Sequence, residues 1–417
     1  ASWIFARFGL YYLSGAALFL AAGYLYVYDY RRSGNLIHLR GLFSCFWVGG
    51  QGAACLKLSK LQTDWALQTW ICFFLALVGF WITFEVLDRL MGGNERFTMN
   101  RYRQRSTVRP LFFCIVGLTV ISAAAFVTEA AVLGFIPVLV RGVPHAYSAF
   151  HMTGLHYVTV SCVLIPAMTV LYFEQGGSRS GRKNGLIVLC TLVSIAIPIL
   201  CVSRFQLVFA VILAVFTFCA SQKNVSPWLF VAAVVALIPC YVLLTVARSH
   251  DVTYLNGIFE MKNSRMPIFV SQPYIYIANN YENFDCLVKA LPAHTWGIRM
   301  LFPVWALTGL KFLYPYLVSF PIYVDKTELT TVTLIYDAYY DFGIIGVLVF
   351  ACILGAVCFF LVEKLREMKN PMGYLFYGQM AIYMMLSFFT TWFSNPTTWF
   401  YFLVTAVLTF YCSVSRR

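Results

Sequence analysis

The sequence predicts an all-α polytopic membrane protein with about eleven transmembrane helices. Three observations lead to this fold class. Residues of the set AVILMFWYC make up 60% of the 417 positions, charged residues make up only 11%, and the mean hydropathy is +0.75. Soluble domains are typically about 45–50% apolar and about 25% charged. This chain therefore has too few charges to cover a water-facing surface, which excludes a soluble enzyme, a disordered chain and a fibrous protein.

Apolar runs long enough to cross about 30 Å of hydrocarbon recur along the chain. They are continuously apolar and do not alternate, which favours helices over barrel strands. The second run is the weakest, because a Gly-Gly-Gln-Gly sequence at 49–52 interrupts it. We expect residues 1–417 to form a single transmembrane domain. Its expected spans are residues 8–28, 42–58, 66–87, 111–128, 153–173, 185–202, 205–220, 228–247, 342–362, 374–394 and 398–414.

Positive charge is concentrated in alternate connecting segments. Segments 29–41, 88–110, 174–184 and 363–373 and the tail Arg416–Arg417 are rich in Lys or Arg. If the expected spans alternate, all of these segments fall on one side, and such a bias marks the cytoplasmic side. The C-terminus is therefore expected in the cytoplasm. The net charge of +13 follows mainly from topology and does not indicate a nucleic-acid partner.

The opposite face receives a long segment, residues 248–341. At roughly 90 residues it is too long to be a plain connection. Its middle, residues 294–320, is rich in Trp, Leu, Phe and Tyr and is broken by Pro303 and Pro315. We expect a large extracytoplasmic loop with short amphipathic helices at the outer interface, forming part of an active-site cavity.

Cysteine usage predicts neither a metal site nor a disulfide framework. The chain has 13 cysteines, and all except Cys286 lie inside apolar stretches. No CxxC pair and no Cys/His ligand spacing occurs. We expect no metal and no cofactor.

Arginines on the outer side are candidates for binding an anion. Arg204 lies between two apolar spans with almost no loop, where a charge is costly unless it is paired or functional. A guanidinium can donate two hydrogen bonds to a phosphate group, although an arginine that reaches to the headgroups is the structural alternative. Arg248, Arg265 and Arg299 run against the topological bias, and for each of them a solvated loop charge is the alternative.

Three outer residues are candidates for proton transfer, in the order His294, Asp337 and Glu129. Asp337 and Asp341 are four residues apart where a span begins, so they share a helix face. A carboxylate there also suits the positive end of the helix dipole, which is the structural alternative. Glu129 ends a span, and a lone histidine such as His294 can equally be structural.

Aromatic and amide side chains follow one another in residues 271–284, which we expect to form a helix or loop. Sugar rings stack on aromatic faces, and their hydroxyls need amide or carboxylate partners. An interfacial aromatic belt is the alternative. The expected glycan-binding residues are Tyr274, Tyr276, Asn280, Tyr281 and Asp341.

Several features occur in a characteristic order along the chain. Glu129 is followed by Gly-Phe-Ile-Pro at 134–137, Ser203-Arg204 separates two spans, and a large outer segment runs into Asp-Phe-Gly-Ile-Ile-Gly at 341–346. Together they resemble the Wzy-type polymerases of bacterial O-antigen and exopolysaccharide, over roughly residues 125–360. One element departs from the pattern. The spacing from Arg299 to Gly309 is one residue short of the RxxxxxxxxxxG element of some relatives.

The resemblance implies a GT-C-like glycosyltransferase of the bacterial cytoplasmic membrane, active at its outer face without a metal. Donor and acceptor would be oligosaccharide repeat units linked to undecaprenyl pyrophosphate. Arginines would neutralise the departing pyrophosphate, and a His, Asp or Glu would act as general base. The bilayer and a polysaccharide chain-length regulator are the further expected partners.

Two other functions remain open from the sequence. An O-antigen ligase would use a lipid A acceptor in place of a repeat unit. A transporter or flippase of anionic lipid-linked glycans would use Arg204 as an anion site. Transporters usually carry structural repeats with broken helices, and no repeat is evident in this sequence.

Overall fold

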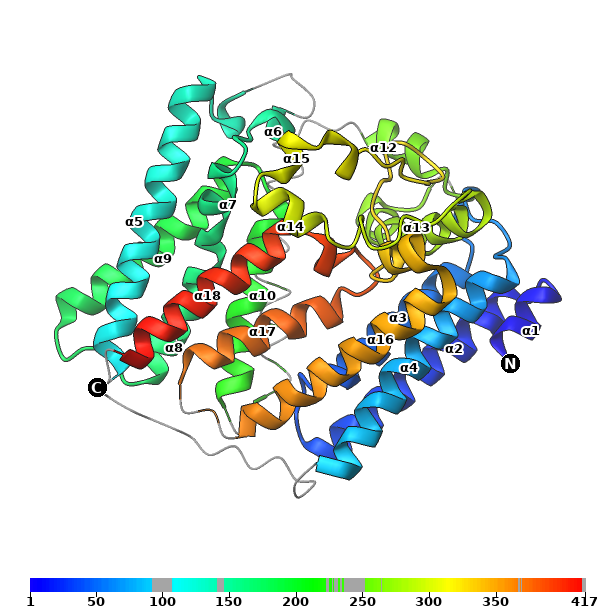
Figure 1. Cartoon of the computed structure of the whole chain (residues 1–417), viewed down its shortest axis with the longest axis horizontal. Helices are drawn as coiled ribbons and strands as arrows, with labels where there is room; N and C mark the ends of the chain where they lie inside the picture. Colours follow the sequence, from blue (N-terminus) through cyan, green and yellow to red (C-terminus); the bar gives the residue numbers. More distant parts are fainter. Residues whose placement is uncertain are drawn as a thin grey trace. The chain divides into compact units, whose positions relative to one another are not determined.

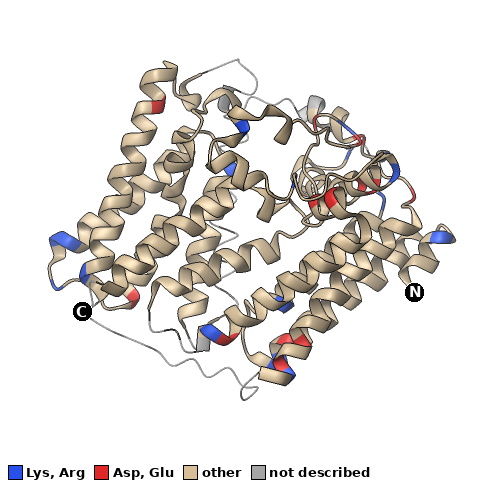
Figure 2. Cartoon of the chain, viewed as in Figure 1, with Lys and Arg blue, Asp and Glu red and all other residues tan. Residues whose placement is uncertain are grey.

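The computed structural model describes residues 1–91, 107–140, 146–222, 252–263, 265–366 and 370–414, with the single positions 225, 226, 228, 232, 235 and 368. Throughout these residues the regular secondary structure is helical (Figure 1), apart from one isolated bridge between Ser59 and Met261. The all-α fold class is therefore confirmed. Figure 2 shows charged residues mostly near helix ends and in the connections.

Seven helices of the described chain are long and apolar enough to cross a membrane, which supports a polytopic membrane protein. The third of them combines α7 (Leu155–Val160), η3 (Ser161–Leu164) and α8 (Ile165–Glu174). The others are α4 (Leu67–Met91), α5 (Val108–Leu133), α9 (Gly181–Leu200), α10 (Arg204–Ser221), α16 (Tyr336–Arg366) and α18 (Pro396–Val414).

Four expected spans are not among these seven. Helices α2 (Tyr11–Ser33), α3 (Leu39–Cys55) and α17 (Met372–Met385) cover three of them, but they are shorter or less apolar than the seven. The fourth, residues 228–247, lies almost wholly outside the described residues. The count of eleven and the sidedness of the loops stay predictions.

The chain divides into two compact units. The first unit comprises residues Ala1–Phe97, Asp251–Glu363 and Tyr383–Trp399, and the second comprises Thr98–His250, Lys364–Ile382 and Phe400–Arg417. The expected single transmembrane domain stays a prediction.

In the first unit, the glycine-rich run of α3 is a helix-packing surface. A Cβ atom on Gly15 of α2 would lie 2.9 Å from the carbonyl oxygen of Gly52, and one on Gly50 would lie 2.5 Å from the hydroxyl of Tyr281. Small residues allow membrane helices to approach closely. The residues that weaken the second expected span in the sequence therefore allow α3 to pack against α2 and α13 (Ile268–Ala290).

Charged side chains join the ends of α2, α3 and α4. The guanidinium of Arg40 donates through Nε to Asp29 at 2.9 Å and through a terminal nitrogen to Glu85 at 2.8 Å. It also stacks on Trp81, with its central carbon 4.1 Å from the ring centre. Arg32 adds bonds to Glu85 at 3.0 Å and to Asp88. The Arg40 side chain is only 1% exposed and forms a buried ion pair with Asp29. Arg40 therefore has a structural role in addition to its part in the charge bias of the connecting segments.

The segment expected as a large outer loop contains both short helices and one long helix. Pro-bounded helices α14 (Phe302–Leu307), α15 (Leu310–Leu313) and η4 (Pro315–Leu317) match the expected short helices. Helix α12 (Val252–Phe259) precedes the 23-residue α13. The Tyr- and Asn-rich stretch 271–284 is therefore a helix.

Polar contacts join pairs of apolar helices in the second unit. The hydroxyl of Thr169 in α8 lies 2.7 Å from that of Thr191 in α9. The amide of Gln379 in α17 donates to Thr405 of α18 at 2.7 Å. Hydrogen bonds of this kind stabilise helix pairs in lipid. The cysteines of the described chain are free thiols in both units.

Candidate functional site

The first turns of α16, in the first unit, bring four predicted site residues together. These are His294, Arg299, Asp337 and Asp341. The two aspartates are four residues apart on α16, and both meet the segment 294–300. Both aspartates therefore lie on the same face of α16, as their spacing in the sequence predicts.

Asp341 holds the backbone of that segment in place. Its carboxylate is fully buried and accepts hydrogen bonds from the hydroxyl of Thr295, from the backbone N–H of Arg299 at 3.2 Å and from that of Met300 at 2.7 Å. Donors therefore surround both carboxylate oxygens. The structure gives Asp341 a positioning role, and its expected glycan contact stays a prediction.

Arg299 is oriented by three neighbours. Its Nε donates to a carboxylate oxygen of Asp337, and its central carbon lies 4.6 Å from the ring centre of Tyr340 and 5.3 Å from that of Tyr336. The side chain is 16% exposed. Its two terminal nitrogens make no hydrogen bond to a described residue. The two terminal nitrogens, with which a guanidinium can bind a phosphate, are therefore fixed in place and available to a ligand.

His294 contacts the same tyrosine, Tyr340, through one ring nitrogen. Its Nδ1 is 3.2 Å from the carbonyl oxygen of Tyr340, so Nδ1 carries the hydrogen and donates. In the neutral tautomer with hydrogen on Nδ1, the imidazole Nε2 carries the lone pair and can accept a proton. It points toward Gly343, where a Cβ atom would lie 3.0 Å away. Gly343 has φ 61° and ψ −146°, so α16 is kinked beside the histidine.

Three of the predicted glycan-binding residues make hydrogen bonds within the protein. The Tyr281 hydroxyl donates to the carbonyl oxygen of Trp47 at 2.8 Å, and the Tyr274 hydroxyl donates to Gln62 at 2.7 Å. The side-chain amide of Asn280 donates to the carbonyl oxygen of Phe388 at 2.8 Å. All three side chains are buried.

Tyr276 is the more accessible of the predicted glycan-binding residues. It is half-buried, and its ring centre lies 6.3 Å from that of Phe389. The glycan-binding role of the four α13 residues stays a prediction.

Two carboxylates on α13 make hydrogen bonds to the segment that precedes α4. Glu282 accepts hydrogen bonds from the backbone N–H of Thr63 at 2.8 Å and from the indole of Trp65 at 3.0 Å. Asp285 accepts one from the backbone N–H of Ala66 at 2.8 Å and pairs with Lys289. Burial raises the pKa of Glu282, and the hydrogen bonds from Thr63 partly offset that shift. These contacts fix the chain just before α4.

In the second unit, Glu129 forms a pair with a histidine. Its carboxylate is fully buried, and both of its oxygens lie 3.2 Å from Nδ1 of His156. The backbone N–H of Met152 donates to the same carboxylate at 3.1 Å, and the ring of His151 is 5.1 Å from that of His156. Sequence reasoning missed His156, because no local motif links it to a glutamate 27 residues earlier.

The structure describes two of the other three predicted arginines. Arg204 begins α10 in the second unit and is 9% exposed. Arg265 lies on an exposed turn between α12 and α13 in the first unit. Arg248 lies outside the described residues. Among the described residues, no group of three or more His, Cys, Asp or Glu side chains could hold a metal ion.

Comparisons with family models, curated proteins and solved structures give no match for this chain.

Proposed function

We propose that the chain joins undecaprenyl-pyrophosphate-linked oligosaccharide units into a polysaccharide at the outer face of the cytoplasmic membrane. The observation that supports this most is the set of contacts that Arg299 makes. Asp337 and two tyrosines hold its guanidinium, while its terminal nitrogens make no hydrogen bond to described residues. A pyrophosphate leaving group needs such a fixed, positive two-pronged donor when no metal assists.

The reaction needs three events at one carbon atom. A hydroxyl oxygen of the acceptor sugar bonds to the anomeric carbon of the donor, and the bond from that carbon to the pyrophosphate oxygen breaks. The pyrophosphate leaves with the bonding electron pair, and the hydroxyl proton passes to a base. Attack opposite to the leaving group inverts the anomeric centre. Arg299 would stabilise the charge that builds on the leaving oxygen.

Within this cluster, His294 is the best candidate for the base. Its Nε2 is free to accept a proton once Nδ1 donates to Tyr340. Asp337 is engaged by Arg299, and Asp341 is engaged by three donors, so both carboxylates are less able to act as bases. In the second unit, Glu129 would act through His156.

The experiment is a reaction of the purified protein with fluorescent undecaprenyl-pyrophosphate-linked repeat units, analysed on gels. We expect a ladder of products that differ by one repeat unit. Its rate should fall about 10²–10⁴-fold in His294→Ala, whereas Lys262→Ala, at an exposed position of the first unit, should leave the rate within twofold of wild type.

Other outcomes would point to the alternative functions. Consumption of the donor only when lipid A is added would indicate a ligase. Movement of intact donor across a vesicle membrane without a new glycosidic bond would indicate a transporter. Either result would contradict the proposed polymerase activity.

A further inference from the structure

A pocket in the second unit lies where α5 begins and where the chain turns from α8 into α9. Its volume is about 530 Å³. Three of its lining residues are cations, Arg109, Arg179 and Lys183. Three others are aromatic, Phe112, Phe113 and Tyr172. None of them belongs to the candidate site described above.

The positive charge of this pocket is not balanced. No carboxylate lines it, and no ion pair in the described chain joins Arg109, Arg179 or Lys183 to an acidic residue. Glu174 at the end of α8 is close in sequence, but its carboxylate accepts a hydrogen bond from Gln222. A concave surface with charge of one sign attracts counter-ions, so the pocket favours an anion.

Apolar surface continues from the cations along two helices. Arg109 and Phe113 are four residues apart and share a face of α5, and the Phe113 side chain is 50% exposed. Lys183 and Leu186, which are three residues apart, also share a face of α9, and Leu186 is 39% exposed. A ligand that covers both parts has an anionic head and an apolar tail. A small water-soluble anion would cover only the cations.

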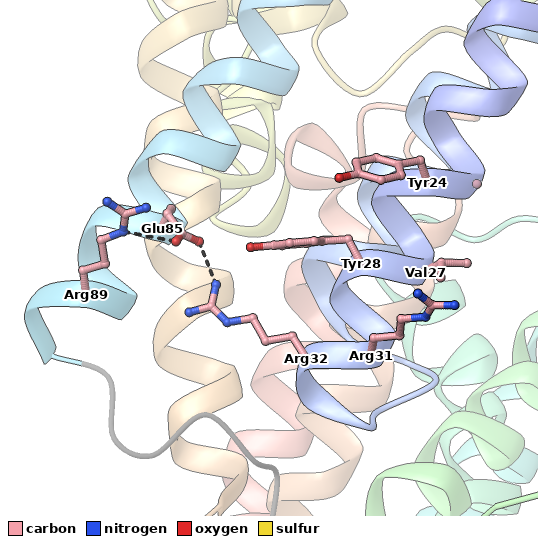
Figure 3. A pocket seen from close by; sticks show the side chains of 8 residues that line it. Tyr24, Val27, Tyr28, Arg31, Arg32, Glu85 and Arg89 are labelled. Carbon is pink, nitrogen blue, oxygen red and sulfur yellow. Dashed lines mark hydrogen bonds and ion pairs between the residues drawn. The ribbon is translucent and has the colours of Figure 1, made fainter.

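A second arginine-rich pocket, in the first unit, shows that arginines alone do not leave a pocket with unbalanced positive charge. It has a volume of about 850 Å³ and is lined by Arg31, Arg32, Arg89 and Glu85, among others (Figure 3). There Arg32 pairs with Glu85 and Asp88, and Arg89 pairs with Glu85 at 3.2 Å. Carboxylates already balance most of its charge, so it serves as an internal comparison.

We propose that the pocket around Arg109, Arg179 and Lys183 binds the headgroup phosphate of an anionic membrane phospholipid. The acyl chains would lie along the exposed faces of α5 and α9. On the predicted topology, residues 88–110 and 174–184 are cytoplasmic, and basic pockets between membrane helices on that side suit anionic headgroups. This site is independent of the proposed glycosyl transfer.

The test is a lipid titration of the purified full-length protein, followed by native mass spectrometry. Phosphatidylglycerol is compared with phosphatidylcholine that carries the same acyl chains. We expect wild type to prefer phosphatidylglycerol. Each neutralised cation should weaken that binding about fivefold, since one basic residue near an anionic headgroup contributes about 1 kcal/mol.

The main variant is the triple substitution Arg109→Gln, Arg179→Gln and Lys183→Gln. It should lose the preference for phosphatidylglycerol while its melting temperature stays unchanged, because all three side chains are exposed. The charge-keeping Lys183→Arg should retain the preference. Arg32→Gln with Arg89→Gln, in the balanced pocket, should reduce binding far less than the triple variant.

Three results would overturn the proposal. The first is equal binding of the two lipids by wild type. The second is an unchanged preference in the triple variant. The third is complete displacement of phosphatidylglycerol by millimolar inorganic phosphate, which would show a site for a soluble anion in place of a lipid.

Discussion

At the scale of single residues, Arg40 and Arg299 differ in what their guanidinium groups can still bind. All three side-chain nitrogens of Arg40 donate to Asp29 or Glu85. Only Nε of Arg299 donates to a described carboxylate, that of Asp337. Arg40 is buried and Arg299 is half-buried, yet only Arg299 has donors left for a ligand. The number of free donors therefore separates a structural arginine from a candidate functional one.

Removal of Arg40 should destabilise the first unit strongly. In Arg40→Met the carboxylate of Asp29, 1% exposed, would stay buried without its partner. Loss of one member of a buried ion pair typically costs about 3–5 kcal/mol of folding free energy. Thermal unfolding in detergent would measure this cost, with Arg31→Met on the exposed face of α2 as the control. Equal melting temperatures for the two variants would contradict the structural role of Arg40.

Substitution of Gly343, at the kink of α16, should destabilise the protein. Gly343→Ala would place a side chain at φ 61° and ψ −146°, a region used almost only by glycine, and 3.0 Å from Nε2 of His294. Strain of this kind costs about 1–3 kcal/mol. We expect both stability and activity to fall. The matched control is Gly117→Ala in α5, where a Cβ atom meets no neighbour within 4 Å. A Gly343→Ala protein as stable and active as the control would argue against this kink geometry.

At the scale of helices, the local pattern predicts the element, but distant partners decide the role of its side chains. Residues 271–284 were expected as a helix or loop, and they form part of α13. Their tyrosines and asparagines suggested a sugar site, yet Tyr281 bonds to Trp47, which is 234 residues away. Likewise Glu282 bonds to Thr63 across 219 residues. Contacts of this range follow from tertiary packing, so the sequence pattern alone could not show them.

The contact between α13 and the start of α4 should depend on pH. Burial raises the pKa of Glu282, so the folded protein keeps the proton on this carboxyl to a higher pH than the unfolded chain does. The folded state binds more protons, and stability should therefore fall as pH rises from the ordinary glutamate pKa through the raised one. Melting temperatures of wild type and Glu282→Gln across this range would measure the effect. The variant should show a shallower decline, and parallel curves would refute the assignment.

At the scale of the whole molecule, composition predicted the fold class, because a chain with so few charges cannot cover a soluble surface. The exact set of membrane helices could not be predicted in the same way. Helix α3 packs through glycines that interrupt its apolar sequence. Helix α2 contains tyrosines and arginines that lower its hydropathy. The candidate site was predicted in part. Arg299, Asp337, Asp341 and His294 were all named, but the pair of Glu129 with His156 joins residues with no sequence signal.

The predicted topology can be tested with exposed positions on two segments. Arg265→Cys lies on the turn expected outside, and Arg182→Cys lies on the segment expected inside. A membrane-impermeant thiol reagent on intact cells should label the first and spare the second, with the parent chain labelled in parallel to subtract its own cysteines. Both sites should react once the membrane is permeabilised. The reverse pattern would overturn the orientation and with it the outer location of Arg299.

The proposed polymerase activity depends on the fork of Arg299, which neutralises the departing pyrophosphate. Its most direct test is the initial rate of repeat-unit polymerisation by purified Arg299→Lys and Arg299→Gln, beside the exposed control Arg31→Gln. A lysine keeps the charge but lacks the fork that can hold Asp337 and phosphate together. We therefore expect both Arg299 variants to lose about 10²–10³-fold in rate, the scale seen when one oriented donor to a developing charge is removed. The control should stay within twofold of wild type. A wild-type rate in Arg299→Lys would contradict the fork, and a wild-type rate in Arg299→Gln would contradict the account as a whole.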